Sequence, residues 1–77
     1  MAYASLTITT TPQQVPAGWA ELEYVSGSVP YIGTDSSVAS TTGFPMTLNS
    51  IMINGTGSQI IWLVTATGTA DVRWISV

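Results

Sequence analysis

The sequence predicts an all-β protein, a small antiparallel β-sandwich or jelly-roll-like barrel of about seven or eight short strands. Gly and Pro interrupt the chain roughly every ten residues, which is typical of closely spaced turns. The stretches between them are rich in Val, Ile, Thr, Tyr and Trp, the residues that favour strands. With 77 residues, the chain is expected to form one domain over residues 1–77, with residues 1–5 as an N-terminal arm.

Each expected strand lies between turn-forming residues. The loop over residues 11–18 holds Pro12 and Pro16, which cannot donate to a strand ladder. Pro45 and a bend near Asn49 interrupt another extended stretch, and the Asn-Gly sequence at residues 54–58 predicts a turn. Strands are therefore expected at residues 3–10, 19–25, 29–32, 44–53, 59–67 and 70–77, with a brief pairing at 38–40.

Alternation of apolar and polar residues predicts which faces are buried. In the segment 19–25, Leu22 and Tyr24 point one way, and Glu21 and Glu23 point the other. The last strand repeats this pattern, with Val72 and Trp74 opposed to Asp71, Arg73 and Ile75. Residues 60–64 are apolar without alternation, which predicts a strand covered on both faces.

The composition is typical of a protein that is part of a larger protein assembly. Only 6% of the residues are charged, against about 25% in an average soluble domain, and 45% are hydrophobic. Burial of apolar surface in a chain of this length contributes about 110 kcal/mol, whereas ordering the chain costs about 115 kcal/mol. Because no cysteine is present to form disulfides, we expect the protein to gain stability by self-association.

The chain has few side chains that perform chemistry. It contains no His, Cys or Lys, and Arg73 is its one basic residue. Acid–base catalysis, nucleophilic catalysis and most metal sites depend on the missing groups, so we expect no enzyme and no cofactor. A net charge of −3 argues against binding to nucleic acid or to an anionic membrane. The first residues lack the pattern of a secretory signal, so we expect the protein to be made and retained in a cytoplasm, or to be carried out by something other than the secretory machinery.

Two acidic features are candidate sites. Glu21 and Glu23 project from one strand face about 7 Å apart, a separation used by inverting glycosidases, but a solvated outer face explains them more simply. Asp35 lies in a Gly-Thr-Asp-Ser-Ser loop, where its oxygens could ligate calcium. An Asx-turn accounts for Asp35 equally well, and we expect no metal.

The aromatic residues favour packing or a protein interface, and a sugar-binding platform is the alternative. Trp62 lies within the most apolar segment and is expected in the core. Trp74, beside Arg73, is expected to anchor an interface. Trp19 follows a Pro/Gly loop and is expected at the surface.

The order of these segments resembles a known group of proteins. It comprises a Thr-rich first strand at 6–11, a short strand ending in Gly at 29–33, a Ser/Thr-rich link to 42–48, and a final hairpin at 61–74. This order resembles the small all-β structural proteins of tailed bacteriophage virions, especially capsid decoration (cement) and head-fibre-base proteins. The resemblance implies a homo-oligomer, often a trimer, that binds the major capsid protein or another virion protein at many equivalent sites.

The sequence therefore predicts a non-enzymatic virion protein that is assembled in the host cytoplasm and stabilises or decorates the capsid surface. A tail or collar component is the runner-up, a carbohydrate-binding module for host attachment is an alternative from another class, and a small hydrolase is a distant third. The residues expected to form contacts with other subunits or with the shell are Trp19, Trp74, Ile75, Val77, Ala2, Tyr3 and Leu6.

Overall fold

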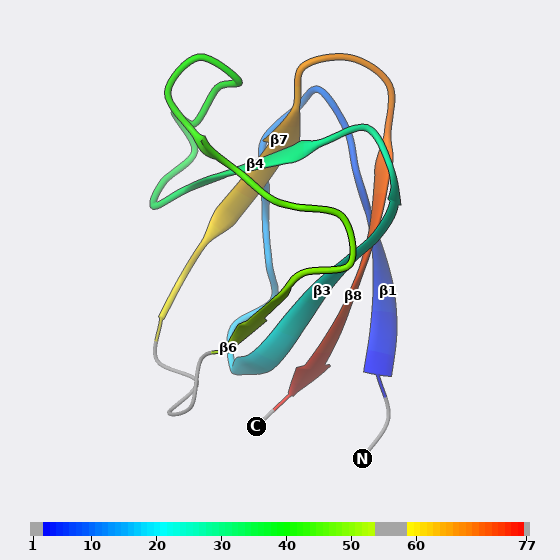
Figure 1. Ribbon diagram of the computed structural model, residues 1–77. Coiled ribbons are helices and arrows are strands. Elements are labelled where there is room, and N and C mark those ends of the chain that lie inside the picture. The colour runs from blue at the N-terminus through cyan, green and yellow to red at the C-terminus, as the bar shows by residue number, and fades with distance from the viewer. Residues whose placement is uncertain (1–2, 54–58, 77) are drawn as a thin grey trace.

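The computed structural model describes residues 3–53 and 59–76 (Figure 1). Their strands are β1 (Tyr3–Ile8), β2 (Gln13–Gln14), β3 (Trp19–Gly27), β4 (Pro30–Gly33), β5 (Phe44–Pro45), β6 (Ile51–Ile53), β7 (Trp62–Thr65) and β8 (Ala70–Ser76).

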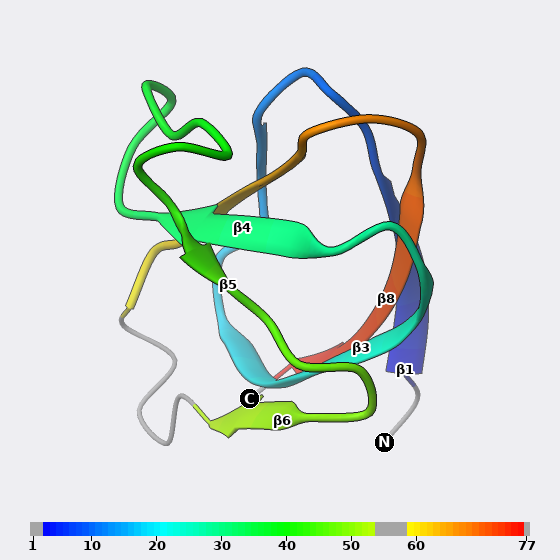
Figure 2. The ribbon, with the colours of Figure 1, turned by 45° about the horizontal axis from the view of Figure 1, so that its top comes forward.

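The strands form two antiparallel sheets of four strands each. One sheet has the order β1-β8-β3-β6 and the other has the order β2-β7-β4-β5. The predicted all-β fold class is confirmed as a small β-sandwich (Figures 1 and 2). The described residues include no helix long and apolar enough to cross a membrane.

The β1-β8-β3-β6 sheet follows the predicted alternation. Leu22, Tyr24 and Val72 are buried, whereas Asp71 and Arg73 are exposed on the opposite face. Side chains of neighbouring strands therefore lie in rows across the sheet, because each strand pairs in register with the next.

The core lies between the two sheets. The Tyr24 hydroxyl donates a hydrogen bond to the Gly27 carbonyl, so its polar end is satisfied next to the core. The clustered buried residues are Ile8, Val15, Trp19, Leu22, Tyr24, Met46, Ile61, Leu63, Ala70 and Val72, with Leu6, Ile32, Met52 and Trp74 packed against them.

Strand β7 is covered on both faces, as its apolar run predicts. Leu63 and Val64 are adjacent and both are buried, although they point to opposite sides of the sheet. On the side away from the core, buried Val38 lies against Gly33 of β4 so closely that a Cβ at Gly33 would be 2.4 Å from the Val38 Cβ. The loop between β4 and β5 thus packs over the sheet, and Trp62, expected in the core, is half-buried.

Several boundaries differ from the predictions. A two-residue strand, β2, forms within the expected proline loop, because its residues lie between Pro12 and Pro16 and can still pair with β7. Residues 38–40 form no strand, since Val38 packs over the sheet. The final strand is described from Ala70 to Ser76, its expected last residue lies outside the described residues, and β7 is shorter than expected. The turn predicted at 54–58 lies outside the described residues.

The expected N-terminal arm is wrong for residues 3–5. Tyr3, Ala4 and Ser5 pair with Ile75, Trp74 and Arg73 as the first half of β1. The reason is that β8 is long enough to offer backbone partners along the whole of β1. Residues 1 and 2 lie outside the described part of the chain.

Candidate functional site

The outer face of the β1-β8-β3-β6 sheet gathers most of the charge of the protein. Four of the five charged side chains lie on it: Glu21, Glu23, Asp71 and Arg73. The register places three of them, Glu21, Glu23 and Arg73, in two rows across the sheet. One row runs Tyr3, Ile75, Glu21, Ile53, and the next row runs Ser5, Arg73, Glu23, Ile51.

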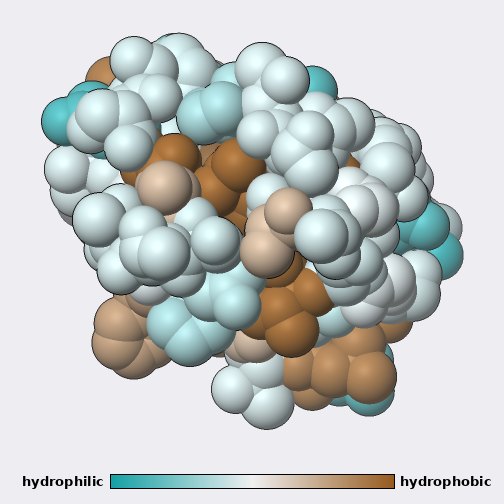
Figure 3. All heavy atoms as spheres, turned by 90° about the horizontal axis from the view of Figure 1, so that it is seen from above, coloured by the Kyte–Doolittle hydropathy of each residue, from teal (hydrophilic) through white to brown (hydrophobic). Residues whose placement is uncertain are grey.

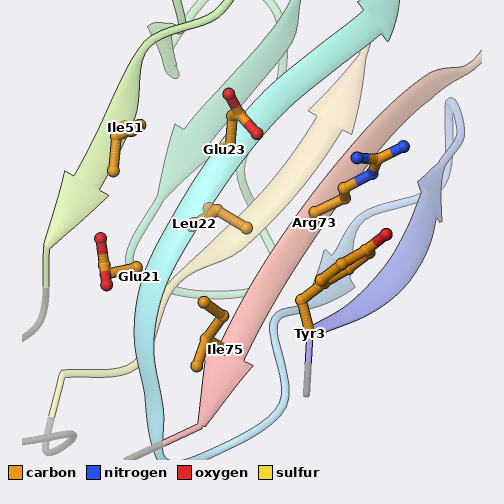
Figure 4. Close-up of a pocket in the computed structure, with 7 residues that line it drawn as sticks. All are labelled: Tyr3, Glu21, Leu22, Glu23, Ile51, Arg73 and Ile75. Carbon is orange, nitrogen blue, oxygen red and sulfur yellow. The ribbon is translucent and has the colours of Figure 1, made fainter. Parts of the chain in front are cut away.

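A shallow hollow of about 250 Å³ opens on this face (Figure 4). The guanidinium carbon of Arg73 lies 5.1 Å from the centre of the Tyr3 ring, within the range of a cation–π contact. Figure 4 shows the Arg73 side chain extending beside Tyr3 and away from both glutamates. The lining residues are Tyr3, Glu21, Leu22, Glu23, Ile51, Arg73 and Ile75.

The two glutamates share this face, as their spacing predicts, but their surroundings favour binding over hydrolysis. Glu21 and Glu23 stand among aliphatic side chains and next to the strand that carries Arg73. Such a surface offers hydrogen-bond acceptors, a cationic donor and apolar contact area. These are the components of a protein interface.

The loop that carries Asp35 is held by its own hydrogen bonds. The Ser37 hydroxyl and the Ser37 backbone N–H both donate to Oδ1 of Asp35, the latter at 2.9 Å. These hydrogen bonds, the hydroxyl first, lower the pKa of the Asp35 carboxyl from its usual value of 3.8. The Asx-turn therefore accounts for Asp35. Within residues 3–53 and 59–76, no three His, Cys, Asp or Glu side chains gather as metal ligands would.

A second surface follows the segment that joins the sheets. Residues 44–53 run from beside β4 to beside β3 (Figure 2), held by hydrogen bonds from the Met46 N–H to the Pro30 carbonyl and from the Asn49 N–H to the Tyr24 carbonyl. Asn49 makes the bend with a φ of 65°. This segment closes one side of the sandwich and carries a hollow of about 300 Å³.

Four large apolar side chains of this segment face solvent. Phe44 is 75% exposed, Leu48 53%, Ile51 57% and Ile53 73%. We call these four residues the apolar strip. Figure 3 shows that strongly hydrophilic residues occupy few places on the face it draws, and that hydrophobic patches lie open between pale side chains.

The residues expected to contact other subunits or the shell lie in different parts of the structure. The prediction that Trp19 lies at the surface is wrong. Trp19 is fully buried, and its indole N–H donates a hydrogen bond to the Gln59 carbonyl at 3.0 Å. Trp74 and Leu6 pack against the core, and each of them is partly buried. Ala2 and Val77 lie outside the described residues.

Tyr3 and Ile75 are the expected contact residues that lie together on an outer face. They are register partners, and both line the hollow beside Arg73. Sequence reasoning placed Ile75 on the same face as Arg73, but it did not connect Tyr3 with them. That connection depends on the pairing of β1 with β8, which joins the two ends of the chain.

The apolar strip was missed by sequence reasoning. Residues 44–53 were expected to be extended, and the bend near Asn49 is confirmed. Exposure of Phe44 and Ile53 had no sequence signal apart from Pro45, which indicates an edge position. No family model matches this chain, and no curated protein or solved structure matches it either.

Proposed function

We propose that this chain is a non-enzymatic structural protein of a tailed-bacteriophage virion, a decoration or cement protein that binds the capsid surface as a homo-oligomer. The observation that carries the proposal is the apolar strip, in which four of ten consecutive residues are large, apolar and more than half exposed.

The strip supports binding to another protein. Monomeric soluble proteins rarely leave a contiguous apolar area open, and such areas mark interaction sites. Here the strip continues into the hollow beside Phe44 and Met52, so a partner side chain has both a surface and a recess to fill. No Lys or Glu interrupts the segment 44–53, although exposed sheet edges normally carry such charges to prevent pairing.

The capsid as partner comes from the resemblance of the sequence to virion proteins. A shell offers the same site many times, so an oligomer can bind it through several modest contacts at once. A trimer is the expected oligomer on this basis. The major capsid protein is the proposed partner, and the scarcity of charge suits a protein that is covered on more than one side.

Co-sedimentation tests the proposal. The purified protein is mixed with empty capsids, and separately with tails, of the phage that encodes it, and its bound amount is measured by gel densitometry. We expect saturable binding to capsids at a fixed ratio to the shell protein. Binding to tails alone would indicate a tail or collar protein in place of a capsid protein. Binding to neither would refute the virion assignment.

A pair of variants tests the role of the apolar strip. Phe44→Ser combined with Leu48→Ser should weaken capsid binding by at least about tenfold, because both side chains are more than half exposed in the free protein and their loss should affect folding little. Val29→Ser is the matched control, since Val29 is also apolar and 39% exposed but lies outside the strip. Equal binding by the double variant and the control would refute the role of the strip.

A further inference from the structure

We propose that the outer face of the β1-β8-β3-β6 sheet binds the same face of a second copy of this chain, about a two-fold axis that runs along the strands between β8 and β3. This proposal deepens the self-association part of the proposed function. It is tested on the purified protein without capsids, so the two proposals fail separately.

The arrangement of charge on the face motivates this pairing. Arg73 on β8 and Glu23 on β3 occupy the same row, at equal distances from the line between the two strands. A two-fold axis along that line exchanges the two columns when a second copy lies face to face with the first. Arg73 of each copy then stands opposite Glu23 of the other, and the contact occurs twice.

The other natural axis does not give this match. A two-fold axis across the strands, between the two rows, would place β3 on β3 and β8 on β8. Glu21 would then face Glu23 of the second copy, and like charges in a desolvated contact are strongly unfavourable. The axis along the strands avoids this repulsion, since it places Glu23 opposite Arg73 and Glu21 opposite Ile75 of the second copy.

The same axis pairs apolar side chains at the rim of the face. The outer strands β1 and β6 exchange places, so Tyr3 of each copy lies opposite Ile53 of the other. Both side chains are more than half exposed in the single chain, with Tyr3 at 59% and Ile53 at 73%. Burial of these four side chains supplies the apolar part of the interface.

The Arg73 guanidinium is partly ordered by a contact within its own chain. Its guanidinium lies against Tyr3, and Figure 4 shows it directed away from the glutamates of its own chain. Arg is favoured at interfaces because its planar group can stack on a ring and bind a carboxylate at the same time. The contact with Tyr3 reduces the conformational entropy that Arg73 would lose on binding.

The size of the face sets the expected affinity. Four strands about 4.8 Å apart and about 20 Å long give roughly 400 Å² per copy, or roughly 800 Å² in the pair. Stable complexes usually bury about 1,200 Å² or more. We therefore expect a weak dimer that forms between micromolar and millimolar concentration. Because the contact is isologous, it closes at two copies, and a trimer would need a further surface such as Phe44 and Leu48 of the apolar strip.

Charge reversal provides the decisive experiment. Arg73→Glu and Glu23→Arg are each prepared, and association is measured by sedimentation equilibrium up to millimolar concentration. Each variant alone should dimerise at least about tenfold more weakly than the parent, because two like-charged contacts replace two complementary ones. An equimolar mixture should regain the association. In the mixed pair, the introduced glutamate of one variant faces the introduced arginine of the other, and the unchanged Glu23 faces the unchanged Arg73.

The experiment on the mixture distinguishes contacts between two chains from charge repulsion within one chain. Glu23 and Arg73 are also cross-strand neighbours, so each reversal places like charges side by side on the sheet. That repulsion is unchanged on mixing, so regained association can arise only between chains. Circular dichroism of each variant checks that it is folded.

Asp35→Arg is the matched control for net charge. It changes the net charge as much as Glu23→Arg does, but Asp35 lies in the exposed loop after β4 and not on this face. Asp35→Arg should itself dimerise as the parent does, and its mixture with Arg73→Glu should show little association beyond that of the two variants measured separately. Rescue by this control, failure of the Glu23→Arg mixture, or a parent protein that stays monomeric at millimolar concentration would each overturn the proposal.

Discussion

Replacing Gly27 by alanine is expected to destabilise the protein by about 2–5 kcal/mol. Gly27 ends β3 with a φ of +93°, a backbone conformation that costs an L-residue about 1–2 kcal/mol. A Cβ at this position would also lie 2.4 Å from the Thr69 carbonyl oxygen. That oxygen accepts a hydrogen bond from the Ser28 N–H at 2.9 Å, so it cannot move away without breaking a backbone contact.

Gly18→Ala is the control that separates the two contributions. Gly18 has a similar φ of +85°, but a Cβ there would meet nothing within 4 Å. This variant should therefore lose only the conformational part, about 1–2 kcal/mol. The difference between the two variants measures the collision with Thr69, for which we expect about 1–3 kcal/mol.

Thermal unfolding followed by circular dichroism can resolve this difference. In a domain of this size, 1 kcal/mol shifts the midpoint by about 4–8 °C, so a gap of about 2 kcal/mol separates the two midpoints by roughly 8–16 °C. Small domains have about 5 kcal/mol of stability, so a loss near the upper end of the expected range would leave Gly27→Ala partly unfolded at ambient temperature. Equal midpoints for the two variants would refute the packing of β3 against the turn before β8.

The core, the Asp35 loop and the first strand each give a further prediction. Trp19→Phe should lower the free energy of unfolding by about 2–4 kcal/mol in urea titrations, because it removes volume from the core and the hydrogen bond to Gln59; a loss below about 1 kcal/mol would contradict the burial. The Asp35 carboxyl should titrate below pH 3.8 by NMR, and Ser37→Ala should raise its pKa toward that value. Because this pKa is lowered on folding, the stabilisation is present above 3.8 and disappears as the pH falls through the folded-state pKa; an unshifted titration would contradict the Asx-turn. Deletion of residues 2–5 should lower the midpoint of thermal unfolding, since half of the β1–β8 pairing is lost. An unchanged midpoint would indicate that these residues form an arm that does not contribute to folding.

The faces of the long strands could be predicted from the sequence because alternation is a local property. Leu22 and Tyr24 are buried, and Glu21 and Glu23 lie outside, since successive side chains of a strand point to opposite sides. The apolar run through Leu63 and Val64 likewise indicated a strand with two covered faces.

The position of Trp19 could not be predicted in this way. A tryptophan after a Pro/Gly loop has the same local sequence whether it faces water or the core. Its burial depends on the second sheet, which covers it, and on Gln59, which lies forty residues away and accepts its N–H. The same holds for Tyr3, whose place beside Arg73 and Ile75 depends on the pairing of β1 with β8.

Composition and local alternation by themselves determined that this chain forms strands, which side chains of β3 and β8 share a face, and how few groups are available for chemistry. Those properties depend on neighbours in the chain. Only the tertiary structure decided that Phe44 and Ile53 face solvent and that Arg73 and Glu23 share a row. Those properties depend on which strands pair and in which register, and pairing is set by contacts between residues far apart in the sequence.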